Sequence, residues 1–133
     1  MLVRKGGFAV GVFSGSRLIT SKVGSLYVQG RTKAGGWSQQ RFARRRENQA
    51  GKAFEAAAEA SAAILLPVLD DLEAVFLGGD RAAVDAVLSN PRLAAVRAKA
   101  RATVWPVAEP RRRVLEAFPD QFLAVRIHLN HLA

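Results

Sequence analysis

The chain has 133 residues, half of them apolar, and no cysteine. This size suits one folded domain, and the composition excludes a disulfide framework, a cysteine nucleophile and a thiolate metal site. Residues 1–52 hold eleven Lys and Arg but one acid, a net charge of +10, whereas residues 53–133 carry −1. Because so much like charge on a folded surface favours a polyanionic partner, we expect nucleic-acid binding. No apolar run is long enough to span a membrane and the start lacks a signal peptide, so we expect a cytoplasmic protein.

The first 29 residues have the pattern of a three-stranded antiparallel meander. Apolar residues alternate over 7–13, a turn signal follows at Ser14-Gly15-Ser16, and 17–23 is the expected return strand. Residues 25–29 form the expected third strand. The next stretch, from Gly30 to Gly36, has three glycines, two cations and no apolar period, which predicts an exposed basic loop extending to residue 37.

A long helix is expected to begin near Ser38 and to run to about Leu66, where Pro67 ends or kinks it. Its second half has small apolar residues at steps of three and four, a pattern suited to close packing on a sheet. Its first half, residues 38–49, is basic and has Phe42 as nearly its only large apolar residue. We therefore expect the N-terminal turns to project beyond the core.

The remaining elements alternate between helices and strands. In chain order they are a strand at 72–77, a helix at 81–88 capped by Asp80, a helix from Asn90-Pro91, a strand at 103–105, a helix from Pro110 and a strand at 123–127. The order β-β-β-α-β-α-α-β-α-β predicts one three-layer α/β domain over residues 1–133, a mixed sheet with flanking helices.

One segment, 35–49, combines several features that suit an RNA target. It reads Gly-Gly-Trp-Ser-Gln-Gln-Arg-Phe-Ala-Arg-Arg-Arg-Glu-Asn-Gln. The glycines permit close approach to a ligand, and the start of the helix offers backbone N–H groups to an anion. Trp37 can stack on a base, while Gln39 and Gln40 cannot act as bases but can orient a water. The residues predicted to bind RNA are Arg31, Lys33, Trp37, Arg41, Arg44, Arg45 and Arg46.

This segment, together with the hairpin 7–23, the stretch 25–32 and the strand that ends at Gly78-Gly79-Asp80, resembles the Vms-like release-factor domain family in its actinobacterial form. That family is related to the central Gly-Gly-Gln domain of the eukaryotic class-one peptide release factor. The resemblance implies an RNase H-like fold. It also implies a ribosome-associated peptidyl-tRNA hydrolase that frees nascent peptide from stalled ribosomes without reading a codon.

The resemblance also implies partners and roles. The partners are large-subunit rRNA and peptidyl-tRNA, with no cofactor and no metal. Gly36-Trp37-Ser38-Gln39 fits the looser Gly-x-x-Gln pattern of the Vms-like branch, in which the glutamine helps water attack the ester, and Gly35 and Gly36 shape the loop. Because Trp37 and Ser38 interrupt a strict Gly-Gly-Gln, both Gln39 and Gln40 stay candidates for the catalytic residue.

Other expectations concern the whole chain. The first residues resemble a late start into the first strand of the family, so a fuller chain is expected to extend upstream. The length leaves no room for a separate stop-codon-reading domain. We expect a monomer.

Two other hypotheses stay open. The same basic loop would serve a non-catalytic ribosome- or RNA-binding module. A metal-dependent nuclease would need an acidic cluster, and the available acids are Asp70, Asp71, Glu73 and Asp80. Arg111-Arg112-Arg113 is either a second RNA contact or a plain surface patch, and His128 and His131 are expected to be surface residues rather than metal ligands.

Overall fold

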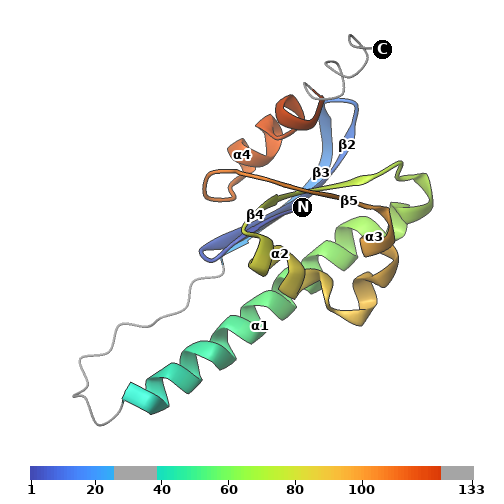
Figure 1. Ribbon diagram of the computed structural model, residues 1–133. Coiled ribbons are helices and arrows are strands. Elements are labelled where there is room, and N and C mark those ends of the chain that lie inside the picture. Colours follow the sequence, from blue (N-terminus) through green and yellow to red (C-terminus); the bar gives the residue numbers. More distant parts are fainter. Residues whose placement is uncertain (26–38, 124–133) are drawn as a thin grey trace.

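A five-stranded sheet organises the molecule (Figure 1). The computed structural model describes residues 1–25 and 39–123, and for residues 39–50 and 53 it describes the backbone alone. The strands are β1 (Leu2–Arg4), β2 (Gly7–Ser14), β3 (Arg17–Ser25), β4 (Val75–Gly79) and β5 (Ala100–Trp105). Their order across the sheet is β3-β2-β1-β4-β5.

The directions of the strands make the sheet mixed. β2 is antiparallel to both β1 and β3, whereas β1, β4 and β5 are parallel to one another. It follows that β3 runs in the same direction as β1, and that β2 runs against the other four described strands. The predicted α/β domain with a mixed sheet is therefore confirmed.

Helices cover both faces of the sheet. The α-helices are α1 (Gln39–Leu65), α2 (Arg81–Leu88), α3 (Ala94–Lys99) and α4 (Arg112–Ala117), and the 3₁₀ turns are η2 (Leu66–Asp71) and η3 (Pro91–Leu93). α1, α2 and α3 pack on one face and α4 packs on the other (Figure 1). This is the predicted three-layer arrangement.

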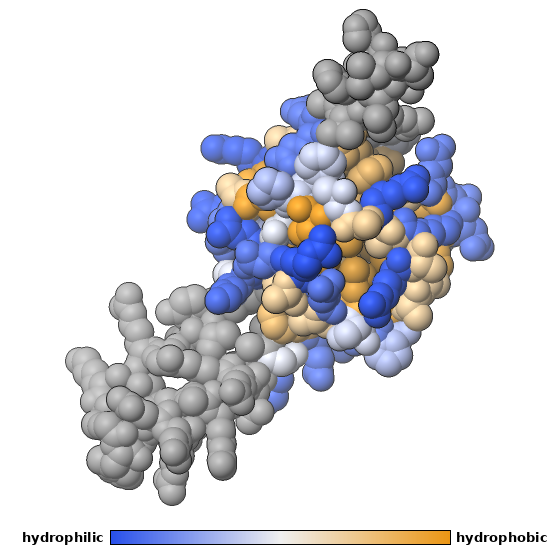
Figure 2. All heavy atoms as spheres, viewed as in Figure 1, coloured by the Kyte–Doolittle hydropathy of each residue, from blue (hydrophilic) through white to orange (hydrophobic). Residues whose placement is uncertain are grey.

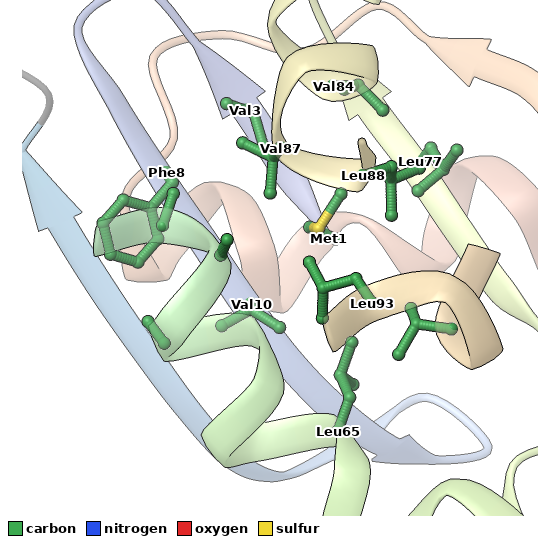
Figure 3. Packing of buried hydrophobic residues seen from close by; sticks show 14 of the residues in the cluster. Met1, Val3, Phe8, Val10, Leu65, Leu77, Val84, Val87, Leu88 and Leu93 are labelled. Carbon is green, nitrogen blue, oxygen red and sulfur yellow. The ribbon is translucent and has the colours of Figure 1, made fainter. Parts of the chain in front are cut away.

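Alternation along the strands divides the apolar residues between two cores. Val3, Phe8 and Val10 point to the face covered by α1, α2 and α3, where Figure 3 shows Val3 beside Val87 in the same cluster as Leu65 and Leu93. Their neighbours in sequence, Leu2 and Ala9, point to the opposite face, where the core includes Leu115 and Phe118 of the α4 region. The two-residue side-chain period of a strand accounts for this division. Small buried residues of α1 (Ala57, Ala58, Ala60, Ser61 and Ala62) let the helix approach the sheet closely, as predicted.

The first strand is tied directly to β4. The Met1 amino group donates a hydrogen bond to the Phe76 carbonyl oxygen at 2.8 Å, and burial lowers the pKa of this amino group to about 5. Further along, Gly79 has a φ angle of 110°, and a Cβ at this position would overlap the Val3 carbonyl oxygen. Glycine therefore permits the close approach of β1 and β4 at their carboxyl ends.

The bounds of several expected strands differ from the structure. The strand expected at 72–77 begins at Val75 and continues through Gly79, and the strand expected at 103–105 begins at Ala100. β3 continues through Gly24 to Ser25 instead of ending before it, because the ring of Phe8 lies over Gly24 and fills the space that a side chain would occupy. The rest of the expected strand at 25–29 lies outside the described residues. Leu123, the first residue of the expected strand at 123–127, is helical, and 124–127 also lie outside.

The helical end of the described chain has a packing reason. Phe118 and Phe122, four residues apart, contact each other edge to face, with ring centroids 5.2 Å apart. Phe122 also stacks on Phe76 of β4, with centroids 4.0 Å apart. A spacing of four residues brings both rings to one side of a helix and close together. In a strand the two rings would point to the same face of the sheet but would lie farther apart.

Candidate functional site

The glutamines singled out in the sequence occupy the first turn of α1. Gln39 is the first residue of the helix and Gln40 the second, in agreement with the predicted start near Ser38. The first four N–H groups of a helix have no partner within it, so this turn can donate to an anion or a polarised oxygen. The helix is also long, 27 residues, so this turn lies far from the opposite end.

The predicted arginines follow within the same helix. Arg41 and Arg45 are one turn apart, and Arg44 and Arg46 lie in the same two-turn stretch. The structure thus brings the backbone positions of both glutamines and four arginines together at one helix end. The other predicted site residues lie outside the described residues; they are Arg31, Lys33, Gly35, Gly36 and Trp37.

This end of α1 extends away from the body of the molecule (Figure 1). Among the described side chains of α1, those that pack in the core begin at Phe54. Phe54 is fifteen positions after Gln39, which corresponds to about 22 Å along the helix axis at 1.5 Å per residue. The prediction that the N-terminal turns project beyond the core is consistent with this arrangement.

The chain that leads to α1 leaves from one defined edge of the sheet. Because β1, β3, β4 and β5 point in the same direction, their carboxyl ends lie along this edge, which we call the carboxyl edge. It comprises residues 4–7, 25, 79–81 and 105–113. β3 ends there at Ser25, whose pairing partner on β2 is Gly7. Ligands of α/β proteins commonly bind beyond the carboxyl ends of parallel strands.

Contacts hold two parts of the carboxyl edge together. The Arg4 guanidinium donates a hydrogen bond to the Val107 carbonyl oxygen at 2.8 Å. The Glu109 carboxylate lies directly against Gly6, in the turn between β1 and β2. The turn that contains Lys5 is therefore packed on the segment that leads into α4.

The sequence pattern did not identify this edge, although it held a usable signal. The order of strands and helices around β4 and β5 already implies parallel strands with their carboxyl ends together, since strand–helix–strand crossovers connect parallel strands. Lys5 and the three arginines at the start of α4 follow strands that end there. On the face shown in Figure 2, hydrophilic and apolar side chains are interspersed, so hydrophilic side chains do not gather in one place on this face. The position of a basic residue on the carboxyl edge is therefore a better guide to a functional site than its charge alone.

Three of the four acidic residues considered for a nuclease lie at the ends of helical elements. Asp70 and Asp71 end η2, and Asp80 occupies the N-cap position of α2, as predicted, although its side chain makes no capping hydrogen bond. Within residues 1–25 and 39–123, no three His, Asp or Glu side chains form a group able to hold a metal ion. His128 and His131 lie outside those ranges. In the same part of the chain, no helix is long and apolar enough to cross a membrane.

Comparison with known proteins identifies the family. A family model described as the Actinobacteria/chloroflexi VLRF1 release factor matches residues 1–128. No curated protein matches the chain. The family match spans all the described elements, from β1 to α4, as well as the segment 26–38. It confirms the resemblance seen in the sequence and implies a release-factor-like role that involves the ribosome. The chain therefore belongs to the Actinobacteria/chloroflexi VLRF1 release-factor family.

Proposed function

We propose that the protein is a ribosome-associated peptidyl-tRNA hydrolase that releases nascent peptide from stalled ribosomes independently of a codon. Membership of a release-factor family supports this function. The observation that carries it is the position of Gln39 and Gln40 at the outer end of α1, about 22 Å along the helix from its first described core contact. A group at such a distance from the body can enter a narrow site that the domain itself cannot enter.

In the proposed reaction one glutamine orients a water beside the ester that joins peptide to tRNA. The glutamine carbonyl accepts a hydrogen bond from the water, and the side-chain or backbone N–H donates to the developing oxyanion. The water oxygen bonds to the ester carbonyl carbon and the bond from that carbon to the ribose oxygen breaks. One proton of the water passes to the ribose oxygen, which leaves as a hydroxyl group. The ester is already activated, so positioning supplies most of what this step requires.

The other residues of the segment hold the glutamines in place. Gly35 and Gly36 give the loop its shape, and Trp37 stacks on a base or ribose. Arg41, Arg44, Arg45 and Arg46, with Arg31 and Lys33 of the loop, bind phosphates of rRNA or tRNA. Arginines within two turns of the glutamines would fix the helix end close to the reacting ester.

Release of labelled peptide tests the proposal. The substrate is peptidyl-tRNA bound to large ribosomal subunits, or to ribosomes without a stop codon. Gln39→Ala, Gln40→Ala and the double variant are compared with Gln49→Ala. This control makes the same change in the same helix, about 15 Å further from the helix start than Gln39. Loss of the responsible glutamine is expected to slow release about 10²-fold or more, while the control keeps the wild-type rate.

Binding and RNA integrity separate the alternatives. Ribosome binding by the double variant is expected to stay near the wild-type value, because the arginines remain. A wild-type protein that binds ribosomes but releases no peptide would support the non-catalytic binding module instead. Cleaved tRNA or rRNA on a denaturing gel would support a nuclease. Unchanged release by the double variant would remove both glutamines from the mechanism.

A further inference from the structure

The start of α4 carries charge in an unfavourable place. Arg111 is the N-cap residue, and Arg112 and Arg113 are the first two residues of the helix, with no acid in the first turn. Cations are unfavourable at a helix N-terminus, where the free N–H groups favour negative charge. Residue choices that oppose local stability occur most often where a site requires them.

Neighbouring acids compensate only part of this charge. Arg112 pairs with Glu116 at 2.8 Å, the one ion pair within the described residues, and the pair is exposed. Arg111 and Arg113 are exposed and have no ion-pair partner in the described part of the chain. Exposed pairs such as Arg112 with Glu116 contribute little to stability, so Arg112 also stays available for a stronger partner.

Lys5 belongs to the same surface. Its turn is held against the segment before α4 by the hydrogen bond from Arg4 to the Val107 carbonyl and by the contact of Glu109 with Gly6. Lys5 is exposed, whereas the Arg4 guanidinium is occupied by this backbone contact. At the other side of the edge, the Arg81 guanidinium is likewise bound to the Ala102 carbonyl at 3.1 Å.

The balance of charge on the carboxyl edge and its close surroundings is positive. Six basic residues outnumber three acidic residues. The basic residues are Arg4, Lys5, Arg81, Arg111, Arg112 and Arg113, and the acidic residues are Asp80 and Glu109 on the edge and Glu116 just beyond it. The side chains that remain free to meet a ligand are mainly basic. The edge is also continuous with the chain that leads to the glutamines, since Gly7 pairs with Ser25.

We propose that the carboxyl edge, through Lys5, Arg111 and Arg113, is a second RNA-binding surface that contacts phosphates of ribosomal RNA at the base of the projecting helix. This inference rests on the proposed function, because it takes its partner from the ribosome. Guanidinium groups match phosphate oxygens in pairs, and an ammonium group adds a point charge. With contacts at both the tip and the base of α1, RNA would fix the direction of the helix as well as its end.

A charge-matched pair of variants tests the surface. The edge variant carries Lys5→Gln, Arg111→Gln and Arg113→Gln. The control carries Arg92→Gln, Arg97→Gln and Arg101→Gln, three exposed residues in η3, in α3 and at the start of β5, at the opposite edge of the sheet. Both variants lower the net charge from +9 by the same three charges. Figure 1 shows α3 and α4 on different sides of the sheet.

The measurement is the affinity for purified large ribosomal subunits over a series of salt concentrations. Each lost phosphate contact lowers the slope of log affinity against log salt by about 0.7–0.9, and weakens binding about fivefold at 0.1 M salt. We expect the edge variant to lose two to three contacts and the control to lose fewer than one. A variant with Arg111→Lys and Arg113→Lys should keep most of the slope, because the charges remain. Circular dichroism confirms that each variant is folded.

The outcomes distinguish this inference from the proposed function. Equal slopes and affinities for the edge variant and the control, with release by the wild type intact, would overturn the second surface alone. A specific loss in the edge variant together with no release by the wild type would support the surface and overturn the hydrolase. Absence of wild-type binding to large subunits at low salt would overturn both.

Discussion

Replacing Gly79 by alanine combines two costs that the structure allows to be estimated separately. The φ angle of 110° is one that residues with a Cβ rarely adopt, and the strain costs about 1–3 kcal/mol. The new Cβ would also overlap the Val3 carbonyl oxygen, so β1 and β4 must move apart. That movement breaks the 2.9 Å hydrogen bond from the Asp80 N–H to the same oxygen, which contributes about 0.5–1.5 kcal/mol. We expect the free energy of unfolding to fall by about 2–4 kcal/mol.

Two other glycines provide matched controls for this substitution. Gly15 has a φ angle of 62°, but a Cβ there would have no atom within 4 Å, so Gly15→Ala should cost only the strain, about 1 kcal/mol. Gly51 lies in α1 with open space around it, so Gly51→Ala should stabilise the protein by about 0.5–1 kcal/mol. Two of the three variants are thus expected to lower the free energy of unfolding, and Gly51→Ala is expected to raise it.

Urea unfolding followed by far-ultraviolet circular dichroism measures all three free energies. In a chain of this length, 1 kcal/mol corresponds to about 3–5 °C in Tm, so thermal unfolding gives an independent check. The decisive comparison is between Gly79→Ala and Gly15→Ala. Equal losses would refute the reasoning, because they would show that the approach of β1 to β4 adds nothing to the cost of the backbone angle.

The remaining stability predictions concern single side chains. Lys99 donates hydrogen bonds to two backbone carbonyls at the end of the η2 region, so Lys99→Met should cost about 1–3 kcal/mol in urea unfolding, whereas Arg97→Met on the same helix should change little. Leu115 is fully buried on the α4 side of the sheet, so Leu115→Ala should cost about 2–5 kcal/mol. Ile19→Ala, at a position that is 57% exposed, should cost less than about 0.5 kcal/mol, and a large loss there would mean that this side chain is covered in solution.

Locally encoded features were predictable from the sequence. The start of α1, its end before Pro67 and the Asp80 cap position all depend on a few adjacent residues. The turn at Asn90 is another case, since its side-chain oxygen accepts a hydrogen bond from the Arg92 N–H at 3.0 Å. Capping groups and prolines act within one turn of the chain, so their pattern can be read without the fold.

Features that depend on distant residues were not predictable. β1 has three residues, too few to show a period, and it is a strand because β2 and β4 pair with it on both sides. The helical state of Leu123 follows from aromatic contacts with β4, since a short apolar run fits either a strand or a helix. For the candidate site, the sequence predicted the helix end with its glutamines and arginines. It did not predict that the turn with Lys5 packs beside the start of α4, because that contact joins segments about a hundred residues apart.

The length of α1 beyond the core also makes the helix a lever. A tilt of 5° about its first described core contact at Phe54 would displace the far end by about 2 Å, given a lever arm of about 22 Å. A misplacement of 1 Å can slow an enzyme about 10²-fold, so contacts at the core end alone would not hold a catalytic group accurately enough. Under the proposed function, the accuracy needed at Gln39 and Gln40 would therefore be supplied at the far end of α1, by contacts with RNA. The proposed hydrolase would then be accurate only when bound, because ribosomal RNA would position the helix end that the free protein leaves unanchored.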